Sequence, residues 1–348
     1  MQTATCDIRL ATPDSAGSWD RYVLSHPQGT IFHSTAWQRV IENAFSHKSH
    51  YLAAFVPDTQ EIVGVLPLFE IKSILFDHYL VSVPFAELGG VLADNQEVAT
   101  ALTTRAIELS AETGVAYLEL KNRQPYPGLL TKALYFNFSR PICSTTEENL
   151  LTIPRKSRAM VRRGIKAGLK AEWGKQLLDE FYLILAKSYH RLGTPIFPKR
   201  LFHAFLDEFA DCIDLMVVRK PGGEGIAAVM TFFYRDRVMP YYAGSLAEYR
   251  ELASNDFMYW VLMEYGREHG FTVFDFGRSK AETGSYHFKK NWGFEPLPLA
   301  YQYHLANASE MPNLSPANPK YRRKIELWRK LPFCLTRFFG PPLAKYLA

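Results

Sequence analysis

GIAAVMTFFYRDRVMPYYAG, residues 225–244, is typical of two antiparallel strands joined by a tight turn. Two apolar runs, 225–234 and 238–243, flank the polar turn at 235–237, and Gly244 follows the second run. Residues from about Ser254 to His269 then carry apolar side chains at helical spacing. Gly270 ends that helix, and residues 271–276, FTVFDF, are typical of another strand.

The same order of elements occurs earlier in the chain. We therefore interpret the sequence as a weak internal repeat in which a hairpin, glycine, a long helix, glycine and a strand follow one another. A chance repetition of strand and helix is the alternative, but the antiparallel hairpin before each helix favours a true repeat. The first copy comprises strands Ile62–Lys72 and Leu80–Pro84, Gly89–Gly90, the helix Gln96–Thr113, Gly114 and the strand Val115–Lys121.

Two copies of a helix packed on a mixed sheet predict two similar α/β domains of the α+β type. The length of 348 residues agrees with two domains. We expect a first domain at 1–150, a second at 151–310 that opens with a basic helix, and a basic amphipathic tail at 311–348.

The net charge of +5 is an average over unlike segments. Residues 153–170 hold seven Lys and Arg and no acid, and residues 320–348 hold eight against one acid, which leaves a net −9 for the rest. Concentrated basic segments indicate anionic partners such as phosphates, nucleic acid or a membrane surface.

The first basic segment, IPRKSRAMVRRGIKAGLK, is expected to form a helix from Ile153 to Lys170. No acidic residue offsets the repulsion between its cations, which a phosphate-rich ligand would relieve. A solvated charged face is the alternative. On a helix, Val161, Ile165 and Leu169 form an apolar side beside Gly164 and Gly168. The candidate phosphate-binding residues are Arg155, Arg158, Arg162, Arg163 and Lys166.

The chemistry is expected at 241–294, where aromatic, glycine and charged residues are concentrated. Lys289 and Lys290 lie beside Phe288 and Trp292, which would hold an ammonium in a partly dry setting where it stabilises a developing oxyanion. Asp275 and Tyr242 are candidates for handling protons. The alternative is that Asp275 and Arg278 form a structural ion pair and that the lysines are surface residues. The candidate substrate-binding residues are Asn255, Arg278, Phe288, Lys290 and Trp292.

Other classes of site are poorly supported. The four cysteines are far apart in the sequence, no H-E-x-x-H pair occurs and no G-x-S-x-G elbow is present, so we expect neither a metal site nor a serine hydrolase. No apolar run approaches the length that spans a bilayer, and residues 1–15 lack a secretory signal pattern. We expect a cytoplasmic protein.

Combined motifs in the second half resemble FemA/FemB-type transferases, and more narrowly the FemAB-like proteins of exosortase (PEP-CTERM) and exopolysaccharide systems. The resemblance extends from about Trp19 to Leu343. The motifs are Y-Y-A-G at 241–244, S-N-D-F-M-Y-W at 254–260, F-D-F-G-R-S-K at 274–280 and Y-H-F-K-K-N-W-G-F at 286–294, with I-P-R-K-S-R-A-M-V-R-R-G-I-K-A-G at 153–168, L-G-T-P-I-F-P at 192–198 and N-P-K-Y-R at 318–322 for the subgroup.

The resemblance implies two tandem GNAT-like domains and acyl transfer, typically of an aminoacyl group from charged tRNA to an amine of a cell-wall lipid precursor. The family's F-K pair matches Phe288-Lys289, so the resemblance implies that Lys289 stabilises the tetrahedral intermediate or the tRNA end. Its phosphate-binding residues match 155–163 by region only. The sequence departs from the family in lacking a long coiled-coil segment, and it lacks the Q/R-x-x-G-x-G/A loop of CoA-dependent GNAT enzymes.

We therefore expect an acyltransferase, aminoacyl in type, that acts on an anionic cell-envelope or exopolysaccharide precursor and binds no cofactor tightly. The donor is aminoacyl-tRNA or acyl-CoA, the acceptor a phosphate-bearing glycolipid or polysaccharide precursor, and the tRNA acceptor end a further partner. No helix-turn-helix signature occurs, so DNA is not expected. The alternatives are acyl-CoA-dependent N- or O-acylation of a polysaccharide, and a non-catalytic scaffold that binds glycan or lipid.

The basic tail has two interpretations. Tyr321, Ile325, Trp328 and Leu331 share a helical face beside several cations, which is typical of a helix lying on the inner face of the cytoplasmic membrane. The alternative is a terminal helix docked on the body of the protein.

Overall fold

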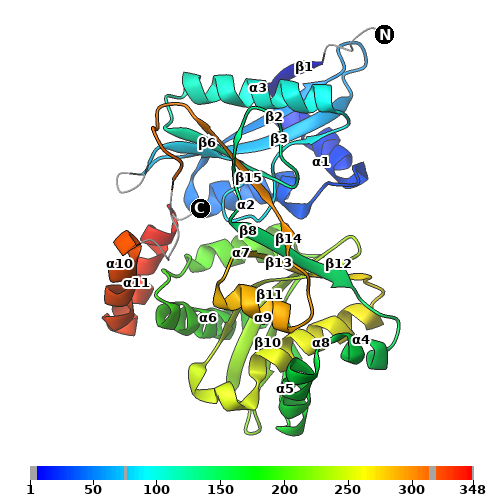
Figure 1. The fold of residues 1–348 in the computed structure, drawn as a ribbon, viewed down its shortest axis with the longest axis vertical. Helices are drawn as coiled ribbons and strands as arrows, with labels where there is room; N and C mark the ends of the chain where they lie inside the picture. The colour runs from blue at the N-terminus through cyan, green and yellow to red at the C-terminus, as the bar shows by residue number, and fades with distance from the viewer. Residues whose placement is uncertain (1–5, 74–76, 313–318, 347–348) are drawn as a thin grey trace. The chain divides into compact units, whose positions relative to one another are not determined.

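The computed structural model describes residues 6–73, 77–312 and 319–346, and it divides the chain into two compact units (Figure 1). The first comprises residues 1–134, 299–313 and 345–348, and the second comprises residues 135–298 and 314–344. Within the described residues, no helix is long and apolar enough to cross a membrane.

The sheet of the first unit has the strand order β1-β2-β3-β4-β6-β15-β7, with β5 paired to β3. Neighbouring strands are antiparallel except β4 and β6, which are parallel. The elements are β1 Asp7–Leu10, α1 Ala16–Ser25, α2 Thr35–Phe45, β2 Lys48–Phe55, β3 Ile62–Ile71, β4 Tyr79–Val81, β5 Leu92–Ala93, α3 Gln96–Glu112, β6 Tyr117–Asn122, β7 Leu130–Lys132 and β15 Ala300–Leu305.

The sheet of the second unit has the order β14-β8-β13-β12-β11-β10-β9, again antiparallel except for one parallel pair, β12 and β13. The strands are β8 Tyr135–Pro141, β9 Lys170–Trp173, β10 Ile213–Arg219, β11 Gly225–Tyr234, β12 Arg237–Ser245, β13 Val273–Lys280 and β14 Leu297–Pro298. The helices are α4 Thr146–Thr152, α5 Arg155–Lys166, α6 Leu178–Leu192, α7 Lys199–Glu208, α8 Ser254–Glu268, α9 Gly284–Asn291, α10 Pro319–Lys330 and α11 Phe333–Ala344.

The two sheets repeat one topology, which confirms the internal repeat. Strands β1-β2-β3-β4-β6-β15-β7 of the first unit correspond in order and direction to β9-β10-β11-β12-β13-β8-β14 of the second. In each copy a long helix, α3 or α8, connects the two parallel strands, as the glycine-bounded pattern predicts.

The sixth strand of each sheet comes from an unexpected part of the chain. β8 lies before residue 150 but pairs with β13 and β14 of the second unit. β15 follows the second copy of the repeat but pairs with β6 and β7 of the first unit. The units therefore differ from the expected domains at 1–150 and 151–310, because the chain passes between them at residues 134, 298, 313 and 344.

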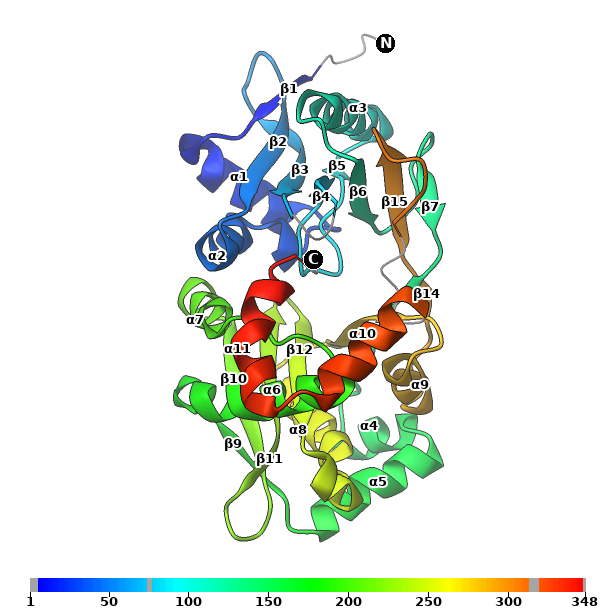
Figure 2. The same cartoon turned by 90° about the vertical axis from the view of Figure 1, so that its left-hand side faces the viewer.

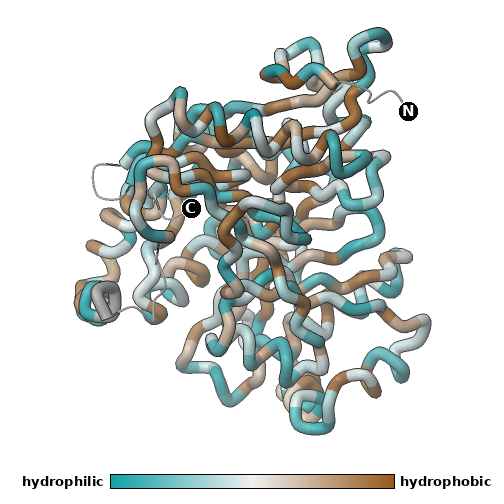
Figure 3. Tube along the Cα trace, turned by 45° about the horizontal axis from the view of Figure 1, so that its top comes forward, coloured by the Kyte–Doolittle hydropathy of each residue, from teal (hydrophilic) through white to brown (hydrophobic). Residues whose placement is uncertain are grey.

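Apolar strands form the core of each unit (Figure 3). In β11 the first eight residues, Gly225–Phe232, are all buried, because α6 packs on β11 and β12 on one side and α8 packs on them on the other. Both faces of this strand are thus covered, and a continuous apolar run replaces the alternating pattern of a half-exposed strand.

The basic helix α5 is shorter than expected, since it ends at Lys166 and Lys170 begins β9. Gly168 has a φ of +69° and lies just beyond the helix end, where the left-handed conformation favours glycine. Ser157, Val161 and Gly164 are buried, and α5 contacts α8. Ile165, expected on the apolar side, is 50% exposed.

Gly164 permits this close contact, because a Cβ added there would lie 2.7 Å from the Cβ of Phe257. We expect Gly164→Ala to lower the free energy of unfolding by about 1–3 kcal/mol, since overpacking outweighs the gain in helix propensity. Gly17→Ala in α1 is the matched control, because a Cβ there meets nothing within 4 Å. Chemical denaturation measures both, and a Gly164→Ala protein as stable as the parent would contradict the packing.

Candidate functional site

The two parallel strands of the second unit separate after a short common start. β12 and β13 pair only at Arg237–Val273 and Val238–Phe274, although they continue to Ser245 and Lys280. Beyond that point β13 keeps its pairing with β8, and β12 keeps its pairing with β11. Alternate N–H and C=O groups of β12 face away from β11, toward the side where β13 has diverged. We call this place the β12–β13 fork.

The corresponding place in the first unit is filled by the chain itself. β4 ends at Val81, and residues 82–91 continue along β6. The Ser82 N–H donates to the carbonyl of Glu119 and the Gly90 N–H to that of Lys121. The Lys121 ammonium donates to the carbonyls of Val83 and Ala86, at 3.0 and 3.3 Å.

The backbone of this filling segment is strained, because Val83 and Phe85 both have positive φ, at 55° and 61°. Its persistence requires the bonds from β6 that hold it. The second unit has its counterpart strands parted, so the geometry favours the second unit as the place where a substrate binds.

At the β12–β13 fork, β13 carries a bulge between Asp275 and Arg278. Gly277 supplies the positive φ of 65° that the bulge requires. The buried Asp275 carboxylate accepts hydrogen bonds from the Gly277 N–H at 3.0 Å and the Asn137 amide at 2.9 Å. Its second oxygen accepts from Arg237 at 3.1 Å. These bonds fix the shape of the strand on one side.

The buried Lys289 ammonium fixes the bulge from the other side. It donates to the carbonyls of Phe276, Gly277 and Arg278 at 2.7, 2.9 and 3.0 Å. The three N–H donors of an ammonium match three acceptors. Lys289 comes from α9, whose N-terminus is capped by the Thr283 hydroxyl.

These contacts differ from the predicted roles of two residues. The Lys289 ammonium donates to backbone carbonyls and does not point to a position where an oxyanion would form. The Asp275 carboxylate accepts hydrogen bonds from the bulge and from Arg237. The alternative interpretation expected an Asp275–Arg278 ion pair, but Asp275 pairs with Arg237 instead, and the Arg278 guanidinium lies 4.7 Å from the ring centroid of Tyr135. Lys289 and Asp275 therefore both fix the position of β13 in this structure.

Two hydroxyl groups near the β12–β13 fork are buried without a hydrogen-bond partner among the described residues: Tyr242 on β12 and Ser279 on β13. Burial raises the pKa of Tyr242 well above its ordinary value, and the charge of Arg278 acts in the opposite direction. A protonated phenol without a partner is a donor that a ligand could satisfy. Tyr242 thus stays a candidate, as a hydrogen-bond donor.

The other predicted substrate residues fall into three environments. Asn255 and Lys290 are exposed, and Phe288 is half-buried against Tyr259 and Trp292. Trp292 is fully buried, and its indole N–H donates to Asp256 at 2.9 Å. A fully buried ring cannot touch a substrate, so Trp292 packs the core instead of binding.

Asp256 is not among the predicted site residues, although it lies in the S-N-D-F motif at 254–257. It lies in the first turn of α8, where its pKa is raised by burial, and the hydrogen bond from Trp292 only partly offsets that effect. A carboxylate kept in a costly environment is typical of functional sites. The sequence signal that could have identified Asp256 is its position directly before Phe257, within the motif S-N-D-F-M-Y-W at 254–260.

The predicted phosphate-binding cations lie along α5. Arg155, Arg162 and Lys166 are exposed on the side opposite the buried Ser157, Val161 and Gly164. Arg163 is exposed on a flank, and Arg158 is half-buried with its Nε donating to the carbonyl of Ile153. Among the described residues, none of these five forms an ion pair with an acid. The structure therefore keeps this cationic surface available to an anion.

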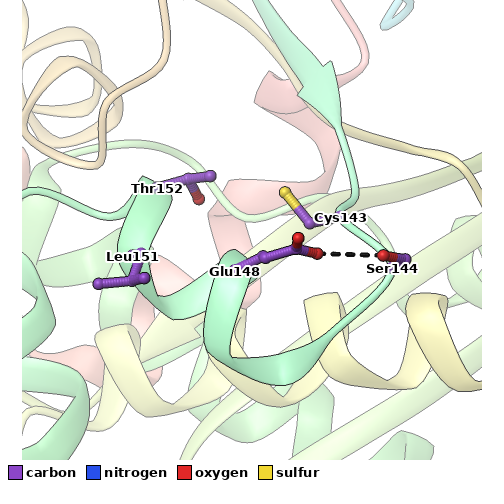
Figure 4. Close-up of a pocket in the computed structure, with 5 residues that line it drawn as sticks. All are labelled: Cys143, Ser144, Glu148, Leu151 and Thr152. Carbon is purple, nitrogen blue, oxygen red and sulfur yellow. Dashed lines mark hydrogen bonds between the residues drawn. The ribbon is translucent and has the colours of Figure 1, made fainter.

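A surface hollow of the second unit lies elsewhere, at α4 (Figure 4). Cys143, Ser144, Glu148, Leu151 and Thr152 line it, and the Ser144 hydroxyl donates to Glu148 at 3.0 Å. It contains none of the predicted site residues. Across the described ranges, no three His, Cys, Asp or Glu side chains gather as metal ligands.

Comparison with known proteins finds partial matches to the chain. The family model of the acetyltransferase (GNAT) domain matches residues 155–290, which run from α5 through both fork strands to Lys289. The lipid II:glycine glycyltransferase of Staphylococcus epidermidis is 29% identical over 131 residues, covering 32% of this chain and 31% of that protein. The glycyltransferase of Staphylococcus aureus is 33% identical over 89 residues, covering 23% and 21%. The chain thus matches less than a third of the length of these relatives.

Solved structures resemble nearly the whole chain. The crystal structure of FemX aligns with a TM-score of 0.65 at 17% identity, over 91% of this chain and 99% of that one. A tandem GNAT protein from clavulanic acid biosynthesis aligns with a TM-score of 0.57 at 11% identity, over 88% and 100%. The expected fold of two tandem GNAT-like domains is confirmed.

The role of Lys289 can be tested by stability. Lys289→Ala removes the ammonium donor from one buried and two partly buried carbonyls, so we expect the free energy of unfolding to fall by about 3 kcal/mol or more. Lys290→Ala, an exposed neighbour, should change it by less than about 0.5 kcal/mol. Urea denaturation distinguishes the two. An unchanged stability of Lys289→Ala would restore the oxyanion role.

Asp256 makes a pH-dependent prediction. Because its pKa is raised in the folded protein, the charged form costs stability above that pKa, and the cost disappears as pH falls through it. Asp256→Asn keeps an acceptor for Trp292 and removes the charge. We expect a higher Tm than the parent at pH 8 and a smaller difference at pH 4, measured by thermal unfolding. Asp207→Asn, exposed on α7, is the control. If Asp256→Asn were no more stable than the parent at pH 8, the charged carboxylate of Asp256 would not destabilise the folded protein, and the prediction would be wrong.

Proposed function

Starting from a FemAB-like chain with a GNAT domain in its second unit, we propose that the protein is an aminoacyl-type acyltransferase. Its acceptor is an amine on a phosphate-bearing glycolipid precursor of the cell envelope. The observation that carries the proposal is that the GNAT match spans both the β12–β13 fork and the cationic helix α5. The similar staphylococcal proteins are named for glycyl transfer involving lipid II, which supports this class of acceptor.

The proposed reaction is aminolysis of an activated acyl group. The acceptor nitrogen attacks the acyl carbonyl, loses a proton, and expels the donor's oxygen or sulfur, which leaves with a proton. Backbone N–H groups of β12 that no longer face β13 suit the carbonyl oxygen of the donor. The Tyr242 hydroxyl is a further donor toward that oxygen or the leaving group.

The proton of the amine requires a base. We assign this role to Asp256, which is half-buried in the first turn of α8 and has a pKa raised by burial, so that its carboxylate is a stronger base than that of an ordinary aspartate. Asp275 and Lys289 act indirectly, since they hold the bulge of β13 that forms one side of the β12–β13 fork. Arg155, Arg158, Arg162, Arg163 and Lys166 bind the acceptor's phosphates.

Two finer points belong to the same proposal. The motifs shared with exosortase-associated proteins favour an exopolysaccharide precursor among the possible acceptors. The donor is aminoacyl-tRNA, because the sequence lacks the pyrophosphate loop of CoA-dependent enzymes, and acyl-CoA is the alternative. The chain is expected to act at the cytoplasmic side of the membrane.

A transfer assay tests the proposal. Purified protein is incubated with a lipid-linked disaccharide-pentapeptide or an exopolysaccharide glycolipid, and with either aminoacyl-tRNA or acyl-CoA, and products are weighed by mass spectrometry. An acceptor that gains one aminoacyl mass supports the proposal and identifies the donor. Retained acceptor binding with no consumption of either donor would instead support the scaffold alternative.

The cationic helix gives a kinetic prediction. Arg155→Gln/Arg158→Gln/Arg162→Gln should raise the KM for the acceptor about tenfold or more with little change in kcat, because the phosphate contacts form before the chemical step. Lys187→Gln/Arg200→Gln/Arg250→Gln removes three exposed cations elsewhere and should leave both constants unchanged. Equal KM values for the two triple variants would remove α5 from acceptor binding.

A further inference from the structure

The terminal helix α11 buries its small residues and exposes its apolar ones. Thr336, Gly340 and Ala344 are buried, and α11 contacts α6 (Figure 2). The Thr336 hydroxyl lies 3.0 Å from Nδ1 of His190 on α6. A Cβ on Gly340 would lie 3.0 Å from Ile196, so glycine lets the helix approach closely.

The opposite side of α11 is apolar and exposed. Leu335, Phe338 and Phe339 are 40%, 74% and 49% exposed. The two phenyl rings contact each other edge to face, with centroids 5.1 Å apart. Cys334 and Pro342 are exposed on the same side. We call these five residues the α11 patch. Scattered apolar side chains are ordinary on a protein surface, but one helix face composed of them indicates an interaction site.

Exposed cations lie on α11 itself and on α10, the helix that precedes it in the chain. Arg337 is exposed on α11, and Arg323, Lys324 and Lys330 are exposed on α10. Residues 319–346 contain a single acid, Glu326. An apolar face with basic neighbours matches an anionic lipid surface, where apolar side chains enter the headgroup boundary and cations contact lipid phosphates.

The helix α10, which precedes α11, is packed against the end of α6. Ile325 packs against Gly193 beyond the end of α6, and Arg329 donates to the carbonyl of Leu192 at 3.0 Å. Ile325, Trp328 and Leu331 of the predicted membrane face are half-buried. The side chain of Tyr321 and the N-P-K-Y-R motif at 318–322 lie outside the residues whose side chains are described. α10 is therefore docked, as the second interpretation expected, and the exposed apolar face belongs to α11.

We propose that the α11 patch docks the second unit on an anionic lipid bilayer surface. A second copy of this chain is a poorer occupant, because pairing two patches would bring the cations of α10 and α11 together with a single acid, Glu326, from each copy. The inference stands independently of the proposed reaction, since it rests on the exposed face of α11 and not on the β12–β13 fork. Its consequence for that reaction is that the enzyme would be concentrated where a lipid-linked acceptor lies.

The test is co-sedimentation of the full-length protein with vesicles of phosphatidylcholine containing 30% phosphatidylglycerol. We expect binding that weakens in 0.5 M salt and with pure phosphatidylcholine. Phe338→Ser/Phe339→Ser should lower the partition coefficient about tenfold or more, because the apolar anchor is lost. Lys330→Gln/Arg337→Gln should lower it on anionic vesicles only.

The matched control is Leu24→Ser/Leu130→Ser, whose side chains are 61% and 49% exposed in the first unit. It should bind like the parent. Equal binding of Phe338→Ser/Phe339→Ser and the parent would overturn the proposal. So would a parent protein that ignores vesicles and forms dimers that the same double variant abolishes in sedimentation equilibrium.

Discussion

The buried ammonium of Lys289 and the buried carboxylate of Asp275 hold one bulge of β13 between them, and the site depends on that constraint. Three consecutive carbonyls, of residues 276–278, converge on the ammonium, and the Gly277 N–H is bound by the carboxylate. A regular strand cannot direct three successive carbonyls to one point, because they alternate in direction. The bulge therefore needs both charges, and with it β13 takes the course that separates it from β12.

The duplicated sheet shows how one topology serves two purposes. In the first unit, Lys121 holds residues 82–91 along β6, so the chain occupies the place where the parallel strands would part. In the second unit, Lys289 holds β13 itself and β12 ends without such a filling segment. Each unit thus uses a buried lysine to fix backbone carbonyls. In the second unit the parted strands also carry two buried hydroxyls, of Tyr242 and Ser279, that have no hydrogen-bond partner among the described residues. The cationic helix α5 belongs to this same unit.

The local sequence was informative where periodicity and glycine determine structure. It placed β11, α3 and α8 nearly to the residue, because these elements bury long apolar faces between glycines. It did not place β8 and β15 in their sheets. Each pairs with strands far away in the sequence, and the residues of a short strand do not specify such partners. It also could not tell that the Lys289 ammonium turns inward to carbonyls, or that Asp256 is half-buried and accepts a hydrogen bond from Trp292 while Asn255 is exposed. The residue types and their spacing are equally compatible with a side chain that turns inward and with one that faces solvent or substrate.

The central claim is that the acyl donor binds at the β12–β13 fork and not at its filled counterpart. Hydrogen–deuterium exchange of the intact protein tests this claim in the presence of an inert donor analogue. Two analogues are used: a short RNA hairpin that ends in an amide-linked amino acid, and a thioether analogue of acyl-CoA. The account predicts that one analogue slows exchange in peptides covering 239–245 and 275–280 and leaves 82–91 unchanged. Slowed exchange in 82–91 without protection of the two fork strands would contradict it.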